Sequence, residues 1–125
     1  MNIEEFRICC LAVKGATEGF PFQSFGAKTI LAFKVMDKLF AYIDLAPKDL
    51  VFRAWMKCDP ERAIELRETY HGIIPYGREP AKAWHGVLLE SDVPDSLIRE
   101  LVNHSAEEVI KSLSKKKQEI YKQQI

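Results

Sequence analysis

The stretch ILAFKVMDKLFAYIDL, residues 30–45, decides the fold class, because it has the pattern of two strands joined by a tight turn. Its two halves are rich in β-branched and aromatic side chains, and Asp37-Lys38 between them has the length of a two-residue turn. In the register that this turn sets, Phe33 pairs with Tyr42 and both side chains lie on one face. The pattern therefore predicts a β-hairpin.

The flanking segments add helices and further strands to this hairpin. Asn2 with Glu5, and Asp59 with Pro60 after it, predict two capped helix starts. The predicted elements are a helix from Asn2 to Gly15, the hairpin, a strand over residues 50–57, a helix from Asp59 to Gly72, a strand over residues 84–90 and a final helix that Asp92, Pro94 and Asp95 open. Residues 17–28 and 73–83 hold glycines and prolines, which predict irregular segments.

Three consecutive strands argue against a doubly wound parallel sheet, in which strands and helices alternate throughout. The sequence predicts an α+β fold: an antiparallel β-sheet, made of a meander plus a further strand, with helices packed on one face. The chain has 125 residues, of which 47% are hydrophobic and 29% charged, so we expect one domain over residues 1–125.

Charge and cysteine content restrict the classes of function. Lys and Arg number 18, as do Asp and Glu, which is far from the basic balance of a dedicated nucleic-acid-binding protein. We find no apolar run long enough for a membrane helix, and the acidic start differs from a signal peptide. Cys9, Cys10 and Cys58 lack the paired spacing of a zinc site. These features predict a cytoplasmic protein with reduced thiols, no metal and no cofactor.

The sequence contains no pattern that is typical of an enzyme. His104 and Ser105 are neighbours in a predicted helix, so their side chains diverge by about 100° and cannot form a nucleophile–base pair. The segment from Gly72 to Gly77 resembles part of a phosphate loop but follows a helix and lacks the Lys-Ser/Thr pair. We therefore expect a binding protein rather than an enzyme.

Two groups of basic residues are candidate contact surfaces. The polar C-terminal end from about residue 114 is one: five lysines and one glutamate lie between residues 111 and 125. It could contact phosphates or an acidic partner, or be a solvated helix end whose lysines face the negative end of the helix dipole. The second combines cations with aromatic side chains and a histidine: Lys34, Lys38, Arg53, Lys57, Arg78, Lys82, Trp84 and His85.

Rings interleaved with cations can stack on bases and pair with phosphates, which makes this second group a candidate nucleic-acid-binding surface. Two other arrangements are compatible with the same residues. Trp84 could anchor the core at a strand start while the cations are solvated, and helices could cover the strand face that carries Arg53 and Lys57.

The chain resembles the MmcQ/YjbR-like family of small bacterial proteins over residues 1–117. The matching stretches fall in the family's order: Asn2–Arg7, Lys14–Glu18, Phe20–Phe22, Phe33–Met36, Lys57–Ala63, Val93–Asp95, His104-Ser105 and Lys115–Lys117. The resemblance implies a fold like that of the frataxin homologue CyaY, with an antiparallel sheet and flanking helices. It is described as a "double wing", and DNA binding is the function that the resemblance implies.

By this resemblance the wings correspond to the hairpin at residues 34–41 and to residues 74–87. The family's tract in the second wing reads Gly-Tyr-His-Met-Asn-Lys-Lys-His-Trp-Asn-Thr-Val. This chain keeps Tyr76, Lys82, Trp84 and Val87, but it has Ala83 where the family places a histidine. An activity that needs this histidine is therefore not expected of this chain.

Two alternatives to DNA binding remain open. The chain could be a non-enzymatic accessory domain that holds a protein partner or small ligand between Trp55, Trp84 and the aromatic loop Phe20–Phe25. A frataxin-like metal site would use the acidic residues of the helix after Asp59, but Arg62 and Arg67 interrupt that row.

Overall fold

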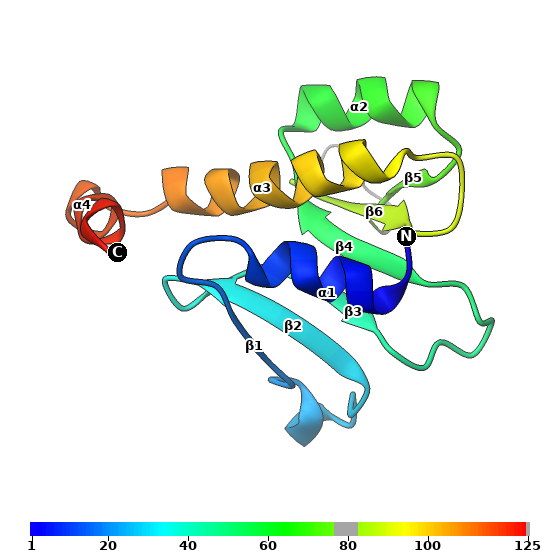
Figure 1. Cartoon of the computed structure of the whole chain (residues 1–125), viewed down its shortest axis with the longest axis horizontal. Helices are drawn as coiled ribbons and strands as arrows, with labels where there is room; N and C mark the ends of the chain where they lie inside the picture. Colours follow the sequence, from blue (N-terminus) through cyan, green and yellow to red (C-terminus); the bar gives the residue numbers. More distant parts are fainter. Residues whose placement is uncertain (77–82, 125) are drawn as a thin grey trace.

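The computed structural model describes residues 1–76 and 83–124, in which one antiparallel sheet carries the fold (Figure 1). Its strand order is β1-β2-β3-β4-β6-β5. The strands are β1 (Thr17–Gly19), β2 (Ile30–Val35), β3 (Lys38–Asp44), β4 (Arg53–Lys57), β5 (Ile73–Pro75) and β6 (Trp84–Leu88). The helices are α1 (Ile3–Leu11), α2 (Pro60–Thr69), α3 (Asp95–Lys111) and α4 (Lys115–Gln123), with a 3₁₀ turn η1 (Gln23–Phe25).

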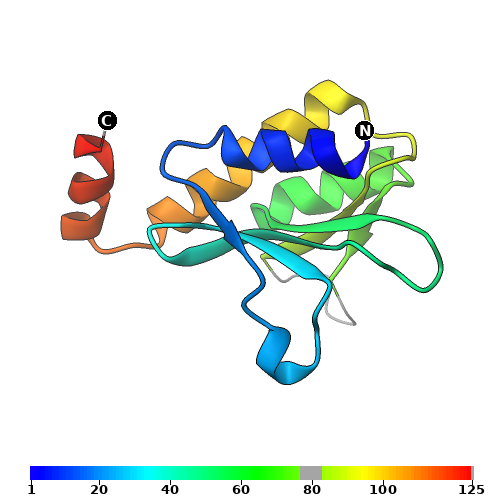
Figure 2. The same ribbon diagram turned by 60° about the horizontal axis from the view of Figure 1, so that its bottom comes forward.

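Helices α1, α2 and α3 cover one face of the sheet, while the loop that contains η1 hangs from the other side (Figure 2). Helix α3 packs against β2, β3 and β4 and also against α1. Its buried stripe includes Ile98, Leu101, Val102 and Val109, which recur at helical spacing toward the sheet. The predicted α+β class, with helices on one face of an antiparallel sheet, is confirmed.

The predicted helix starts are confirmed in atomic detail. The side chain of Asn2 accepts from the backbone N–H of Glu5 at 2.8 Å, and the Glu5 carboxylate accepts from the backbone N–H of Asn2 at 3.1 Å. The Asp59 carboxylate accepts from the backbone N–H of Arg62 at 3.1 Å and caps α2. Both helices end before the predicted glycines, α1 at Leu11 and α2 at Thr69.

The predicted hairpin exists, but its predicted register is wrong. The turn residues are Met36 and Asp37, with φ of 51° and 63°, rather than Asp37 and Lys38. Phe33 consequently pairs with Ala41, and Ala32 pairs with Tyr42, so the side chains of Phe33 and Tyr42 lie on opposite faces.

An irregularity in the pairing decides this register. The pairing of β2 with β3 shifts between Phe33 and Lys34, which leaves Phe40 as an extra residue on β3. The bulge lets Phe40 enter the core together with Phe33, and both side chains are 0% exposed. Burial of two phenyl rings, each worth roughly 1.5–3 kcal/mol, outweighs the left-handed backbone of Met36.

Two short strands lie where the sequence predicts irregular segments, and the polar C-terminal end forms a further helix. Strand β1 falls in the predicted loop and pairs with β2, and β5 falls in the predicted irregular segment and pairs with β6. The basic C-terminal end forms α4, which docks through Tyr121: its hydroxyl donates to the Lys14 carbonyl at 2.8 Å. Across residues 1–76 and 83–124, every helix is too short or too polar to cross a lipid bilayer.

Candidate functional site

The face of the sheet opposite α1, α2 and α3 (Figure 2), hereafter the open face, carries aromatic side chains from three neighbouring strands. Tyr42 of β3 pairs with Trp55 of β4, and Lys57 of β4 pairs with Trp84 of β6. Partners across an antiparallel ladder point to the same face, so these side chains gather on the centre of the sheet. On the opposite face, the neighbours of the same residues in each strand face α1, α2 and α3.

These rings touch one another and form the open-face cluster, which consists of Phe22, Tyr42, Trp55, Tyr76 and Trp84. Ring centroids lie 5.7 Å apart for Tyr42 and Trp84, and 5.5 Å apart for Trp55 and Tyr76. Tyr76 also lies 6.4 Å from Trp84, and Phe22 lies 6.3 Å from Tyr42. Contacts at these distances stabilise the rings as one surface.

The cluster is only partly shielded from water. Tyr76 is 39% exposed, and the other members of the cluster are half-buried. The hydroxyl groups of Tyr42 and Tyr76 form a hydrogen bond at 3.4 Å. Burial, together with this neighbour, raises the pKa of Tyr42, so its hydroxyl stays neutral. The cluster therefore presents uncharged ring surface that a partner can reach.

Gly86 makes room for this arrangement. A Cβ atom at position 86 would lie 2.7 Å from Cζ3 of Trp55 and 2.7 Å from Cγ1 of Ile74. The Trp55 indole thus occupies the space that a side chain on β6 would fill. A larger residue at this position would displace the indole from the open face.

Lys34 and Lys57 place positive charge at the margin of the cluster. The Nζ atom of Lys57 lies 5.8 Å from the ring centroid of Trp84, within reach of a cation–π interaction. Lys34 stands two residues from Ala32 on β2, on the same face as Tyr42. Among the residues that the structure describes, neither lysine forms an ion pair with a carboxylate.

An open pocket of about 340 Å³ adjoins Lys34 on the β1 side of the sheet. Its lining includes Thr17 and Gly19 of β1, Ala32 of β2 and the exposed ring of Phe20. The pocket continues the open face beyond the aromatic cluster, and because Glu18 and Asp37 also line it, it suits an uncharged part of a ligand better than a phosphate.

The other cations predicted for the binding surface do not add free positive charge to the described part of the open face. Arg53 donates to the Asp49 carboxylate at 2.6 and 3.2 Å, which holds the pKa of that carboxyl below its ordinary value and compensates the arginine charge. Lys38 is exposed but pairs with Val35, whose side chain faces the helices. Arg78 and Lys82 lie outside the described residues.

His85 does not belong to the candidate surface, contrary to the sequence prediction. It is 0% exposed and lies on the helix-covered face, because it follows Trp84 directly in β6 and neighbouring residues of a strand point to opposite faces. In the part of the chain that the structure describes, neither ring nitrogen has a hydrogen-bond partner. Burial, with smaller contributions from His104, Arg67 and Arg62, lowers the pKa of His85 to about 4.

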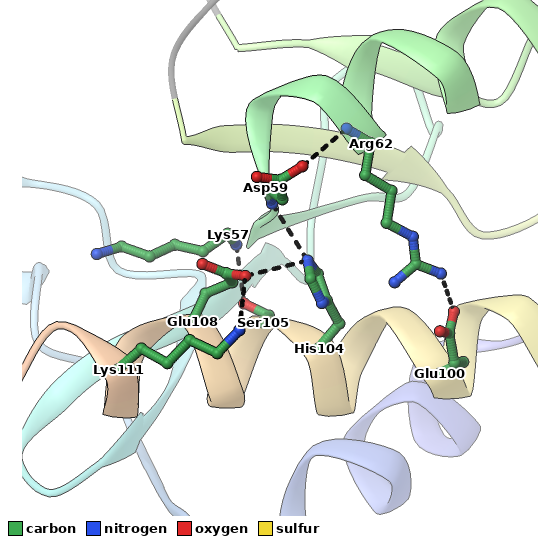
Figure 3. Close-up of polar contacts among 8 residues, drawn as sticks. All are labelled: Lys57, Asp59, Arg62, Glu100, His104, Ser105, Glu108 and Lys111. Atoms are coloured by element: carbon green, nitrogen blue, oxygen red, sulfur yellow. Dashed lines mark hydrogen bonds and ion pairs between the residues drawn. The ribbon is translucent and has the colours of Figure 1, made fainter. Parts of the chain in front are cut away.

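The second polar cluster of interest links α3 to the sheet and to α2 (Figure 3). The Oγ atom of Ser105 accepts from the backbone N–H of Lys57 at 2.8 Å and donates to the Phe40 carbonyl at 2.5 Å. Nε2 of His104 accepts from the backbone N–H of Asp59 at 3.1 Å. Because this hydrogen bond occupies the lone pair of Nε2, His104 is not free to act as a general base. The cluster instead holds α3 against the sheet and against the start of α2.

The described residues do not assemble an activated nucleophile from their cysteines. Burial raises the pKa of Cys58 to about 11 and raises that of Cys10 further, so both thiols stay protonated at neutral pH. Within the same described ranges, no group of His, Cys, Asp and Glu side chains is arranged to hold a metal ion. Arg62, in the acidic row of α2, instead pairs with Glu100 of α3.

Sequence reasoning found part of this site. It placed Arg53 and Lys57 on one strand face and named Lys34 and Trp84, but it did not include Tyr42 or Tyr76 among the site residues. The signal was available for Tyr42, which alternates with buried residues in β3. For Tyr76 it was not, because its contact with Trp55 depends on the pairing of β5 with β6.

Comparison with known proteins agrees with this architecture. A family model described as YjbR matches residues 11–106. The crystal structure of Deinococcus radiodurans protein DR2400, which has a DUF419 domain, is similar with a TM-score of 0.81 and 29% identity, covering 97% of this chain and 88% of that one. A Pseudomonas syringae protein matches with a TM-score of 0.69 and 23% identity, covering 86% of this chain and 97% of that one, which shows the fold alone. None of the curated proteins matches significantly.

Proposed function

The chain belongs to the YjbR family, and we propose that it binds nucleic acid, DNA foremost, on the open face of its sheet. The observation that carries the proposal is the open-face cluster itself, with two lysines at its margin that have no carboxylate partner among the described residues. Aromatic side chains can stack on bases, and lysines beside them can pair with phosphates. The protein would act as a binding protein rather than an enzyme. A location in the cytoplasm is supported by its free cysteines.

The composition of this face favours a ligand with both rings and charge. An antiparallel sheet with one solvated face ordinarily has polar residues on that face. Here Tyr42, Trp55 and Trp84 stand there instead, and Lys57 lies against the ring of Trp84. A nucleotide is complementary to such a surface because it has a flat aromatic base and an adjacent phosphate.

The neutral net charge limits the number of phosphates that the protein can neutralise. Lys and Arg are balanced by Asp and Glu at 18 each. Each phosphate contact lowers the logarithm of the binding constant by roughly 0.7–0.9 per tenfold increase in salt. With Lys34 and Lys57 as the contacting cations, we expect a shallow salt slope of about −1.5.

A small ligand or a protein segment at the same cluster is the second candidate. The loop before β2 brings the Phe22 ring against Tyr42, and the Tyr42 ring in turn contacts Trp84. The aromatic loop is therefore next to the cluster that contains the tryptophans. Such a ligand would bind with a decrease in heat capacity and with little dependence on salt. This difference separates it from a nucleic acid.

The test is fluorescence anisotropy with labelled DNA, single-stranded and duplex, at about 50 and 200 mM salt. We expect binding at the lower salt that weakens several-fold at the higher salt. The double variant K34Q/K57Q should weaken binding further and flatten the salt slope. K48Q/K111Q is the matched control, because it removes two exposed lysines, one from the loop between β3 and β4 and one from α3 on the covered side of the sheet.

Two results would count against the proposal. Absence of binding at about 50 mM salt would overturn it and favour the second candidate. An equal loss of affinity in K34Q/K57Q and K48Q/K111Q would show that net charge, and not the open face, is responsible.

A further inference from the structure

We infer that the open face takes unpaired bases, so that its ligand is a single strand and not a duplex. This inference rests on the proposed function, because it specifies which form of nucleic acid the same site accepts. Three features of the described residues carry it: the accessible ring surface, the small number of cations and the position of the β2–β3 hairpin.

The exposed rings of the open-face cluster are suited to unpaired, unstacked bases. In a duplex the flat sides of the bases are stacked on one another, and a protein reaches only their edges and the backbone. Tyr76 is 39% exposed and contacts both Trp55 and Trp84. The exposed Tyr76 ring can stack on the flat side of an unpaired base, a contact worth roughly 1–3 kcal/mol per base.

Among the described residues, the open face offers fewer uncompensated cations than a duplex site needs. Proteins that hold duplex DNA strongly neutralise about 6–10 phosphates. Within residues 1–76 and 83–124, Lys34 and Lys57 have no carboxylate partner, whereas Arg53 is bound to Asp49. A single strand needs fewer phosphate contacts, because stacking on the rings contributes the larger share of its binding free energy.

The hairpin between β2 and β3 is not placed to enter a groove as a wing. The side-chain amide of Gln124, just after α4, contacts Sδ of Met36 in the turn at 3.6 Å. The adjacent turn residue Asp37 would bring a negative charge toward the phosphates. Because the hairpin tip packs against the C-terminal segment and carries an acid, a groove-reading role is disfavoured.

The tryptophans provide a direct measurement. Both tryptophans of the chain, Trp55 and Trp84, belong to the open-face cluster. The probes are a thymidine oligonucleotide of about 12 nucleotides and a DNA hairpin whose stem has about 12 base pairs. We expect the single strand to quench the tryptophan emission and to bind at least 10-fold more tightly than the hairpin stem.

A ring variant and its control assign the effect to the cluster. Y76L removes an exposed ring, and the lost stacking should weaken single-strand binding about 5- to 100-fold while leaving the hairpin unchanged. I64A is the control, since Ile64 is an exposed apolar side chain of α2, a helix on the covered side of the sheet. W84L gives a second test, with circular dichroism to verify that the variant is folded.

The possible failures are distinguishable. Equal or tighter binding of the hairpin, with unchanged tryptophan emission and no effect of Y76L, would overturn the single-strand inference and leave nucleic-acid binding standing. If neither probe binds at about 50 mM salt, the proposed function itself fails.

Discussion

The two faces of the sheet are built from the same strands, yet they have different roles. On the covered face, Phe33, Met56 and Val87 are each 0% exposed beneath the helices. On the open face, Tyr42 of β3 and Trp55 of β4 are only half-buried, and α1, α2 and α3 lie on the other side of the sheet (Figure 2). The difference shows that an apolar strand face does not by itself imply core, because the helices determine which of the two faces becomes core.

The comparison predicts an unequal effect of ring removal. F33A should lower the free energy of unfolding by about 3–5 kcal/mol, since it empties space beside Phe6, whose ring centroid lies 6.1 Å away. Y76L should cost less than about 1 kcal/mol, because the Tyr76 ring is already accessible to water. Urea denaturation of both variants measures the difference. Equal losses would show that the open face is part of the stabilising core.

A histidine on the covered face makes stability depend on pH. The folded pKa of His85 is lowered from 6.5 to about 4. Above pH 6.5 the group is neutral in both states, and as the pH falls from 6.5 to about 4 only the unfolded state binds the proton. About 3 kcal/mol of stability should therefore be lost over this range.

The variant H85L isolates this contribution. Its free energy of unfolding should decrease less between pH 6.5 and 4 than that of the unmodified chain, because no proton is taken up at position 85. Chemical denaturation at several pH values measures this slope. H71L, at an exposed histidine, is the control and should keep the original slope. Identical slopes for H85L and the unmodified chain would refute the assignment.

A smaller effect is expected from the anchor between the helices and the sheet. S105A removes the hydroxyl that bonds both the backbone N–H of Lys57 and the carbonyl of Phe40. Leaving these backbone groups unpaired should cost about 2 kcal/mol. Thermal or urea unfolding measures this loss of stability, and S112A, at an exposed serine, is the comparison. No loss in S105A would mean that water replaces the hydroxyl at both groups.

Much of the fold could be predicted from local sequence. The capping residues Asn2 and Asp59 act through backbone groups within three residues, so their effect is independent of the rest of the chain. The strands around residues 30–45 and the amphipathic helix α3 can also be predicted from sequence, because one face of each must be buried and its apolar residues recur periodically. These features were sufficient to predict helices on one face of an antiparallel sheet.

The candidate site could be predicted only in part. Lys34 and Trp84 were named from composition, and the structure places them on the open face with Lys57. His85 was assigned to the same surface, although the alternation of a strand places it opposite Trp84. Tyr76 was missed as a site residue, because a three-residue strand such as β5 is too short to show periodicity.

By itself, the sequence determined where helices begin, which segments are strands and which family the chain resembles. Only the tertiary structure decided the hairpin register, the pairing of β1 and β5, and the docking of α4 near Lys14. Each of these depends on contacts between residues distant along the chain, as when the bulge at Phe40 buries a second ring and thereby turns Tyr42 to the open face. Burial of the core under the helices selects that register, and the open-face cluster is its consequence.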